Sequence, residues 1–550
     1  MVFLLLPRMS RNYDHLSHQE LISLLQARDR RDATKFGLVW ETNEIERDKA
    51  FNGDFVALDL DPSLSCGDAP WKNLIIEGDN FDALRYLNMT FKGRVKLIFI
   101  DPPYNTGNKD FVYNDHFVEK EDLWRHSTWC EFMYQRLTLA RDLLREDGSI
   151  FVSIDDNEIF ALGLLMDKVF GEGKHIANIV WESRYSRSSD ASISVSHNFI
   201  LAYSINPDSW KNTRNKLTRN DRQSAQYTNP DNDPRGPWRA IPWDAPNIRP
   251  NLEYPITTPS GDIRLPPPGR HWYRTQDQWE EIVNAGLAYF GRAGNGAPSF
   301  KQFLQDAPGI VPNTWWEHEE AGHTDEAKKE LQEIFGDNPP FDTPKPTRLI
   351  ERILQIATKP DDLVLDFFAG SGTTAHAVAK LNKADGGNRR FILVSSTEAT
   401  TENPDKNLCR DVCAERMRRV ITGYTKANGE AIEGLGGDFA YLRTRKIPSS
   451  AILDIEHDQV WTALQLIHRP TLRPYADQPF LIAEDEEGAL IYVPSFEKEL
   501  IPSLREAVNR HASVIVYSWQ PGLLRQHLRS SHVQHEAIPE SLLRRFGLKS

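Results

Sequence analysis

The sequence predicts an α/β protein with a doubly wound sheet. Two apolar runs, residues 95–100 and 363–367, have the length and composition of buried parallel strands. Each run leads directly into a short motif rich in Pro or Gly. Open α/β sheets bind their ligands beyond the carboxyl ends of the strands. Both motifs are therefore candidate binding elements.

The first motif is Asp101-Pro102-Pro103-Tyr104, which closes the run of residues 95–100. Pro102 and Pro103 lack backbone N–H groups and end the strand pairing, which displays Asp101 and Tyr104 at the strand's carboxyl end. A carboxylate, a free backbone carbonyl at Pro102 and an aromatic ring can hold the amino edge of a flat heterocycle and stack against it. The alternative is a Pro-Pro turn with a surface Asp, because short motifs also arise by chance.

The second motif runs from Phe368 to Thr374, after a strand that ends near Asp366. Gly370 and Gly372 at a strand-to-helix turn let a ligand approach the backbone, and the N-terminus of the following helix favours a carboxylate. A dinucleotide site is the first alternative, but the third glycine of that fingerprint is missing. Asp366 and Phe368 beside the glycines suit a nucleoside-like cofactor with an amino-acid end.

The other predicted elements continue the alternation of short strands and helices. Apolar residues recur at helical spacing over residues 132–144, a helix that Gly148 ends, and again over 349–356. Residues 206–342 are rich in Pro, Gly, Asn and Trp and are expected to form an inserted domain. The two flanking segments would then build one sheet. Its expected strands are residues 74–76, 95–100, 150–154, 199–203, 363–367 and 391–394.

Composition indicates a soluble enzyme of the cytoplasm. The 550 residues allow two to four domains, and the apolar start at residues 2–6 is too short for a signal peptide or membrane span. Met9 is expected to be the better translation start. No disulfide framework and no metal site are predicted, because no His or further Cys stands at zinc-ligand spacing. The four cysteines are Cys66, Cys130, Cys409 and Cys413.

The charge distribution predicts a local basic face on an acidic protein. The net charge of −13 argues against a nonspecific DNA coater, yet from Arg184 to Arg274 there are 13 Lys or Arg against 8 Asp or Glu, a net of +5. A solvated polar insertion is one explanation. The stretch also carries Trp238, Trp243 and Trp272, and cations with aromatic rings suit contact with phosphates and bases. The candidate DNA-binding residues are Arg184, Arg187, Arg214, Lys216 and Arg219.

Together the two motifs resemble those of the DNA amino-methyltransferases that use S-adenosylmethionine. The order, with the Pro-Pro motif first, is that of the family's permuted β class. The chain more closely resembles the modification subunit of type III restriction–modification systems, over roughly residues 10–445. Supporting stretches are residues 13–25, 37–41 and 73–80, Asn105-Thr106-Gly107, and Thr343-Pro344-Lys345-Pro346.

The resemblance implies a doubly wound, permuted methyltransferase-type mixed sheet with an inserted target-recognition domain. Beyond Gly437, the alternation of apolar runs and a helix predicts a smaller α/β C-terminal tail. The tail is expected to contain strands at residues 491–493 and 514–517 and a helix over 497–508, and it serves either for partner binding or dimerisation or as a stabilising appendage. The expected regions are a helical lead-in (1–70), a catalytic half (71–205), the target-recognition insertion (206–342), a cofactor-binding half (343–436) and the C-terminal module (437–550).

The implied reaction is site-specific methylation of adenine N6 in duplex DNA. The Asp101 carboxylate and the Pro102 carbonyl would accept hydrogen bonds from the target amine, and Tyr104 would stack on a base that has left the duplex. Family members that methylate cytosine N4 more often carry Ser in place of the Asp, so Asp101 favours adenine. Cytosine N4 remains the alternative.

The resemblance also implies roles in cofactor binding. Asp79 would line the adenine pocket, although it could instead cap a helix that starts near Phe81. Lys345 would close over the methionine moiety or lie on the surface, and Glu398, which follows Ser395-Ser396-Thr397, would hold the ribose hydroxyls. The full set is Asp79, Asn80, Lys345, Pro346, Asp366, Phe368, Gly370, Gly372, Thr373 and Glu398.

The implied partners are duplex DNA, a second copy of the chain and a separate restriction (helicase–nuclease) subunit, with no membrane. The chain has no phosphate-loop motif of its own. An orphan adenine methyltransferase without a restriction partner is an alternative, and a catalytically dead DNA-specificity subunit is a remoter one, since both motifs are intact. An RNA or protein methyltransferase is a further alternative. The protein-glutamine enzymes usually carry Asn-Pro-Pro-Tyr and place the glycine motif first.

Overall fold

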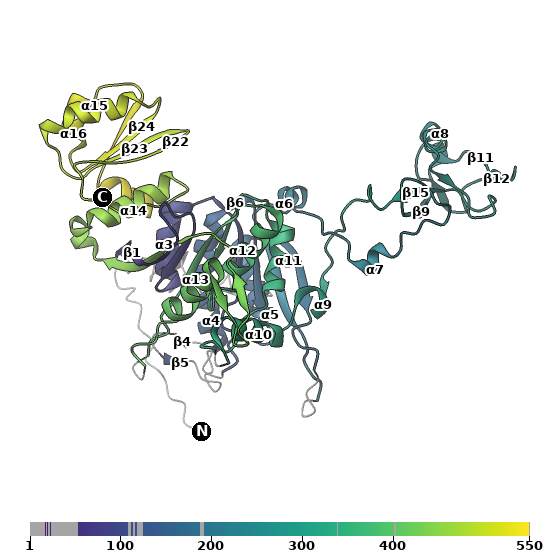
Figure 1. Ribbon diagram of the computed structural model, residues 1–550, viewed down its shortest axis with the longest axis horizontal. Coiled ribbons are helices and arrows are strands. Elements are labelled where there is room, and N and C mark those ends of the chain that lie inside the picture. The colour runs from purple at the N-terminus through teal and green to yellow at the C-terminus, as the bar shows by residue number, and fades with distance from the viewer. Residues whose placement is uncertain are drawn as a thin grey trace. The chain divides into compact units, whose positions relative to one another are not determined.

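The computed structural model describes residues 53–107, 125–186, 192–337, 339–400 and 403–548, together with a few residues elsewhere. Arg187 and nearly all of the supporting stretches 13–25 and 37–41 lie outside the described residues. The helices and strands named below belong to the unit that begins at Asp54, and Figure 1 labels many of them. No helix of the described residues is long and apolar enough to cross a membrane.

A ten-stranded mixed sheet organises this unit, in the order β1-β21-β2-β18-β17-β3-β6-β8-β7-β16. The six strands from β21 to β6 in this order are parallel to one another. At the two ends of this series, β1 is antiparallel to β21, and β8 is antiparallel to β6 and β7. The predicted α/β fold with a mixed sheet is confirmed. The strands are β1 (Phe55–Cys66), β2 (Leu74–Glu77), β3 (Val95–Ile100), β6 (Leu144–Ile154), β7 (His175–Trp181), β8 (Asn198–Ser204), β16 (Trp315–Trp316), β17 (Leu363–Asp366), β18 (Arg390–Ser395) and β21 (Phe439–Ile447).

Strands β3 and β17 are neighbours although they are far apart in the sequence. From β17 the chain passes through α12 (Thr373–Asp385) to β18 on one side. From β3 it passes through the short β4–β5 hairpin (Val112–Tyr113, His116–Phe117) and α4 (Arg125–Leu143) to β6 on the other side. The connections therefore diverge between β3 and β17, which is the point where doubly wound sheets bind ligands.

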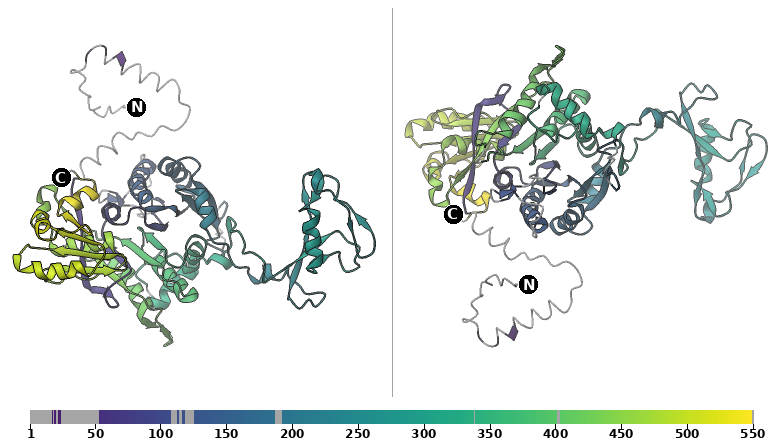
Figure 2. Two further views of the ribbon diagram at one scale, coloured as in Figure 1. Left: turned by 90° about the horizontal axis from the view of Figure 1, so that it is seen from above. Right: turned by 90° about the horizontal axis from the view of Figure 1, so that it is seen from below.

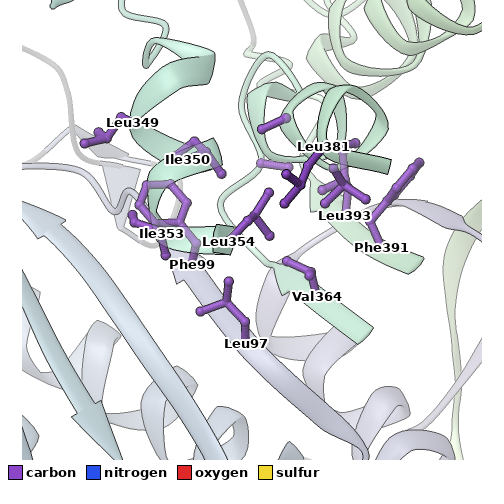
Figure 3. Close-up of a cluster of buried hydrophobic side chains, with 14 of the residues drawn as sticks. Leu97, Phe99, Leu349, Ile350, Ile353, Leu354, Val364, Leu381, Phe391 and Leu393 are labelled. Atoms are coloured by element: carbon purple, nitrogen blue, oxygen red, sulfur yellow. The ribbon is translucent and has the colours of Figure 1, made fainter. Parts of the chain in front are cut away.

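The central strands are apolar on both faces of the sheet, and helices pack over them. Leu97 and Phe99 of β3 pack against α11 (Thr347–Ala357), as Figure 3 shows. Helix α4 packs against α3 (Asn80–Phe91) and also against α5 (Ile159–Phe170). The side chains labelled in the cluster of Figure 3 are Leu97, Phe99, Leu349, Ile350, Ile353, Leu354, Val364, Leu381, Phe391 and Leu393.

Two predicted boundaries differ from the structure. The lead-in over residues 1–70 was expected to be helical, but it contains the long strand β1, which pairs antiparallel with β21. The C-terminal module was expected to begin at residue 437, but β21 completes the large sheet beside β2. The glycines at 436 and 437 lead into a strand rather than a new module. Local sequence could not reveal this, because the partners of both strands lie at the opposite end of the chain.

The insertion is shorter than predicted. Helices α6 (Pro207–Thr213), α9 (His318–Ala321) and α10 (Thr324–Phe335), together with β16, were assigned to it. They instead belong to the main body, because Trp210, Trp316, Ala321 and Ile334 are buried in its core. A rich content of Trp, Pro and Asn therefore marked the insertion's centre correctly and its edges wrongly.

The central part of the insertion has its own apolar cluster and is called the inserted module here, residues 217–310. A bridge between Leu217 and Ile310 closes its base. Its buried side chains are Trp243, Tyr254, Ile256, Trp272, Trp279 and Phe290. Its elements, partly labelled in Figure 1, are α7 (Asp221–Ser224), β9 (Trp238–Pro242), β10 (Asp244–Pro246), β11 (Ile256–Thr257), β12 (Ile263–Arg264), β13 (Arg270–Trp272), α8 (Gln276–Asn284), β14 (Ala288–Tyr289) and β15 (Ser299–Phe303).

The C-terminal region forms the predicted smaller α/β arrangement, drawn in yellow in Figure 2. Strands β23, β24 and β25 are parallel, β22 is antiparallel, and the four form one sheet with a separate apolar cluster. The helix expected over 497–508 is α15 (Ile501–Asn509). The other elements after β18 are α13 (Glu415–Thr422), β19 (Gly423–Thr425), β20 (Ala431–Glu433), α14 (His457–His468), β22 (Leu481–Asp485), β23 (Gly488–Val493), β24 (Val514–Ser518), α16 (Pro521–His527), β25 (Val533–Ala537) and α17 (Glu540–Phe546).

Candidate functional site

The two sequence motifs meet at the carboxyl ends of β3 and β17. The register pairs Leu97 with Val364 and Ile98 with Leu365, so both strands end at the same edge of the sheet. Asp101 follows β3, and Asp366 is the last residue of β17. A third segment reaches this edge, because the Lys345 ammonium forms an ion pair with the Asp101 carboxylate.

Asp101 has one paired and one unpaired oxygen. Its Oδ2 accepts from Lys345 Nζ, which also lies 5.1 Å from the centroid of the Tyr104 ring. Its Oδ1 is buried and has no hydrogen-bond partner among the described residues. Burial acts to lower the pKa of Lys345, but the negative charge of Asp101 outweighs it and the pKa of Lys345 is raised. The site therefore presents a free buried acceptor beside an aromatic ring.

The motif's backbone and ring are held by groups from three other elements. The Trp129 indole of α4 donates to the Pro103 carbonyl at 2.7 Å. The Tyr104 hydroxyl lies 2.8 Å from Ser153 Oγ at the end of β6, and Asn198 Nδ2 donates to it at 3.5 Å. Burial raises the pKa of Tyr104, so the phenol stays neutral. These contacts fix the position of the ring.

The loop after Tyr104 is anchored by a buried carboxyl that sequence reasoning missed. Asn105 has a positive φ of 56° and is fully buried. Its Nδ2 donates to Glu158 Oε1 at 2.5 Å, and His126 Nδ1 lies 2.6 Å from the same oxygen. Glu158 is 0% exposed, and burial raises its pKa. No local pattern identifies Glu158, because its partner lies in another element.

The glycine turn is held together by Asp366. Its Oδ1 accepts from the Phe368 amide at 3.0 Å, and its Oδ2 accepts from the Thr374 hydroxyl at 2.6 Å. Burial raises the pKa of Asp366 to about 7. Gly370 and Gly372 have φ values of 49° and 79°, which favour glycine. A Cβ at Gly370 would lie 3.1 Å from Phe341 Cζ, a tight contact that the Phe341 ring would have to relieve by shifting.

A buried arginine supports the glycine turn from beneath. Arg416 Nη1 donates to Ser371 Oγ at 3.1 Å and to Thr373 Oγ1 at 2.9 Å. Arg416 is 0% exposed, and burial lowers its pKa to about 10, so it is still a cation at neutral pH. Sequence reasoning missed it, although Arg416 lies on the same helical stripe as buried Cys413 and Met417. A charged residue on an apolar stripe signals a buried partner.

Asp79 and Asn80 join the site through the start of α3. Asp79 caps this helix by accepting from the Phe81 amide at 2.9 Å, as the structural alternative had it. Asn80 Nδ2 donates to the Phe367 carbonyl at 3.0 Å and so ties α3 to the end of β17. Arg136 donates to both Asp79 and Asn80. Arg136 is another missed cation on a buried helical stripe, here in α4.

The remaining predicted cofactor residues lie at the margin. Pro346 is the N-cap residue of α11. Glu398 lies beyond the end of β18 with a φ of 51°, and its half-exposed carboxylate forms an ion pair with Lys406 at 2.8 Å. Among the described residues, no hydrogen bond or ion pair links Glu398 to the glycine turn. Glu398 is related to the site by position: it follows β18, which lies next to β17 and ends at the same edge of the sheet.

The predicted DNA-binding residues lie before the insertion and at its start. Arg184 is exposed, and its amide donates to the Ser196 carbonyl at 3.1 Å. Arg214 and Lys216 form no ion pair with any described residue. Arg219 donates to the Ala307 carbonyl at 3.2 Å and lies over the Tyr227 ring at 5.4 Å. Arg214, Lys216 and Arg219 therefore lie near the base of the inserted module, whereas Arg184 lies between β7 and β8.

Among the described residues, one group has ligand atoms close enough to hold a metal ion. It consists of Glu182, His318 and Glu319, whose ligand atoms lie within 4.8 Å of one another. Glu182 Oε2 already lies 2.7 Å from His318 Nδ1. This pairing raises the pKa of His318 and lowers that of Glu182. The group is an ion pair remote in sequence from both motifs.

Residues 95–399 match the model of a DNA methylase family whose members methylate adenine N6 or cytosine N4, and the chain belongs to this family. The Mod subunit of the StyLTI type III restriction–modification enzyme of Salmonella typhimurium is 36% identical over 66% of this chain and 59% of that subunit. The type II methyltransferase M.KpnI of Klebsiella pneumoniae is 32% identical over 66% of this chain and 89% of that enzyme.

Among solved structures, the cytosine-N4-specific PvuII DNA methyltransferase aligns with a TM-score of 0.32 and 13% identity, over 67% of this chain and 98% of that one. The chain spans 59%, 63% and 59% of the length of three type III Mod subunits that it matches.

We expect Asp366→Asn to change how stability depends on pH. The pKa of Asp366 rises from 3.8 to about 7 on folding, so its contribution to the free energy of unfolding is fully present below pH 3.8 and is lost as the pH rises through about 7. Urea unfolding at about pH 5 and pH 8 should show a larger loss of stability in the wild type than in the variant. The exposed Asp68→Asn is the matched control. Equal losses in the wild type and Asp366→Asn would contradict the protonated, buried carboxyl.

Proposed function

We propose that this chain is a site-specific DNA methyltransferase that transfers a methyl group from S-adenosylmethionine to adenine N6 in duplex DNA. The observation that carries the proposal is Asp101 Oδ1, a buried acceptor without a partner, beside the Tyr104 ring and next to the glycine turn. A nucleobase with an exocyclic amine presents two N–H groups and a planar ring. The Asp101 oxygen can accept a hydrogen bond from an N–H group, and the Tyr104 ring can stack on the base.

The protein's part in the reaction is to orient the amine. The lone pair of an exocyclic amine is delocalised into the ring, which makes it a weak nucleophile. Hydrogen bonds from the amine to Asp101 Oδ1 and to the Pro102 carbonyl favour a pyramidal nitrogen and aim its lone pair. The carboxylate also stabilises the positive charge that develops on nitrogen as the bond to the methyl carbon forms. The amine then loses one proton to water.

The residues of the glycine turn fit an S-adenosylmethionine molecule. When bound, this cofactor supplies a methyl group on a positively charged sulfur, which becomes a neutral thioether. The N-terminus of α12, which follows the glycines, suits its carboxylate. Phe368, in the same turn, is assigned with Gly370 and Gly372 to the methionine end, and Asn80 lies beside the turn through its hydrogen bond to the Phe367 carbonyl. Asp366 holds the turn with both oxygens, so its role is to shape the site.

Duplex DNA is the proposed substrate, and the inserted module is the proposed target-recognition element. The target base must leave the stack to reach a site at the end of β3. Arg214 and Lys216 form no ion pair with described residues and can neutralise phosphates near the module's base. The proposed assignment to a type III system rests on the names of the relatives, which include Mod subunits. A restriction subunit and a second copy of the chain are the partners that this assignment implies.

Asp101 favours adenine over cytosine as the target, and the product tests this directly. Purified protein incubated with duplex DNA and S-adenosylmethionine should yield N6-methyladenine at one short sequence. Mass spectrometry of the digested DNA distinguishes it from N4-methylcytosine. N4-methylcytosine would replace the adenine assignment with the cytosine one, and methylation of RNA or protein in parallel reactions in place of DNA would contradict the proposal altogether.

Asp101→Ala should abolish methyl transfer and leave cofactor binding intact. The substitution removes the acceptor for the target amine, whereas the glycine turn is held by Asp366 and Arg416. We expect a loss of at least about 10²-fold in kcat, with the Kd for S-adenosylmethionine from calorimetry unchanged within about threefold. Asp68→Ala, on an exposed turn, is the control. More than a few per cent of wild-type activity in Asp101→Ala would remove this residue from the reaction.

Replacing Arg214, Lys216 and Arg219 together with Ala should weaken DNA binding and flatten its dependence on salt. The slope of log K against log salt concentration is negative, and each phosphate contact that is lost reduces its magnitude by about 0.9. Fluorescence anisotropy with a labelled duplex at several salt concentrations measures the slope. A triple substitution of the exposed Lys498, Arg505 and Arg510 should leave it unchanged. A wild-type slope in the first variant would show that these cations do not contact DNA.

A further inference from the structure

Lys345 lies among the groups proposed to hold the base. Its Nζ pairs with Asp101 Oδ2 and lies 5.1 Å from the centroid of the Tyr104 ring. Its side chain is 10% exposed, against 23% for Asp101. Within the described part of the chain it forms no hydrogen bond or ion pair with residues 368–374. These contacts differ from those expected of a residue that closes over the methionine moiety.

The ion pair divides the two oxygens of Asp101 between two tasks. A carboxylate can rotate about its Cβ–Cγ bond, and either oxygen could then face the target. Lys345 occupies Oδ2, which leaves Oδ1 buried and unpartnered. A single buried acceptor with a fixed direction is what an amine hydrogen bond requires.

The backbone that carries Lys345 is itself held in place. Pro346 is the N-cap residue of α11, whose Leu349, Ile350 and Ile353 are completely buried against β3 and β17. The Thr347 amide and hydroxyl donate to Glu330 at 3.1 Å and 2.7 Å. The ammonium is therefore presented from the rigid start of a core helix, and its direction is set by packing.

We propose that Lys345 is a positioning residue for methyl transfer, which holds Asp101 by Oδ2 so that Oδ1 faces the target amine. This inference rests on the proposed function and assigns Lys345 to the base pocket. The charges are arranged favourably, because the Asp101 carboxylate lies between the Lys345 ammonium and the amine nitrogen on which positive charge develops.

The test compares three variants with the wild type on duplex DNA. Lys345→Gln keeps a hydrogen-bond donor for Oδ2 but removes the charge, and Lys345→Arg keeps the charge. Lys92→Gln is the matched control. Lys92 is the C-cap residue of α3, far from the Asp79 end of that helix, and it pairs with the partly exposed Asp142. For each protein one measures kcat and the KM for DNA, the Kd for S-adenosylmethionine by calorimetry, and the thermal unfolding midpoint.

The expected result for Lys345→Gln is a fall in kcat of about 10²-fold at neutral pH, with a cofactor Kd within about threefold of wild type. The KM for DNA should change much less than kcat, because the lost interaction orients the amine during the reaction. Lys345→Arg, which keeps the charge and a donor for Oδ2, should recover about tenfold of the lost kcat. Lys92→Gln should match the wild type.

Two results would overturn the inference. One is a rise in the cofactor Kd that accounts for the whole fall in activity, which would assign Lys345 to the cofactor. The other is a kcat of Lys345→Arg that is no higher than that of Lys345→Gln. If the glutamine variant does not unfold cooperatively, a fall in kcat of about 10²-fold or more in a folded Lys345→Arg overturns the inference by itself. A wild type that is inactive on DNA would instead contradict the proposed function, so the two failures are distinguishable.

Discussion

The parallel pairing of β3 with β17 is the constraint on which the rest of this site depends. Each strand alone ends in a short motif with an ambiguous meaning, and the pairing places the Asp101 motif beside the glycine turn at one sheet edge. Helix α11 backs both strands with completely buried Ile350 and Ile353 and carries Lys345 to the same edge. Packing of a few apolar side chains therefore decides the geometry of the polar groups, because the motifs have no freedom apart from the strands that they end.

Buried cations hold each turn of the site. Arg416 supports the glycine turn, Arg136 ties the start of α3 to Asp79 and Asn80, and Lys345 holds Asp101. Taking such charges out of water costs several kcal/mol each, so they persist only where hydrogen bonds compensate the loss. The hydrogen bonds fall on turn residues, where regular secondary structure cannot restrain the backbone. The cations thus supply rigidity at the positions where strands and helices leave off.

Prediction from sequence succeeded where a feature is local and failed where it depends on a distant partner. The strands that carry both motifs were predicted because a fully buried strand is a continuous apolar run, and the glycine turn was predicted because Gly370 and Gly372 adopt positive φ. Glu158 was missed because it holds Asn105 from another element. Strands β1 and β21 were missed or misassigned because each is the other's partner across nearly the whole chain. Arg136 and Arg416 could have been predicted from the sequence as buried cations, since each interrupts an apolar helical stripe.

The insertion's edges explain how specificity and chemistry can be separate in one chain. The main body retains the elements on both sides of the inserted module, with Trp210 and Trp316 buried in the main core. The module has an aromatic cluster of its own around Trp243 and Trp272. A substitution inside that cluster therefore leaves the packing of β3, β17 and α11 unchanged. If the module reads DNA as proposed, its sequence can vary to recognise new sites while Asp101, Lys345 and the glycine turn keep their geometry.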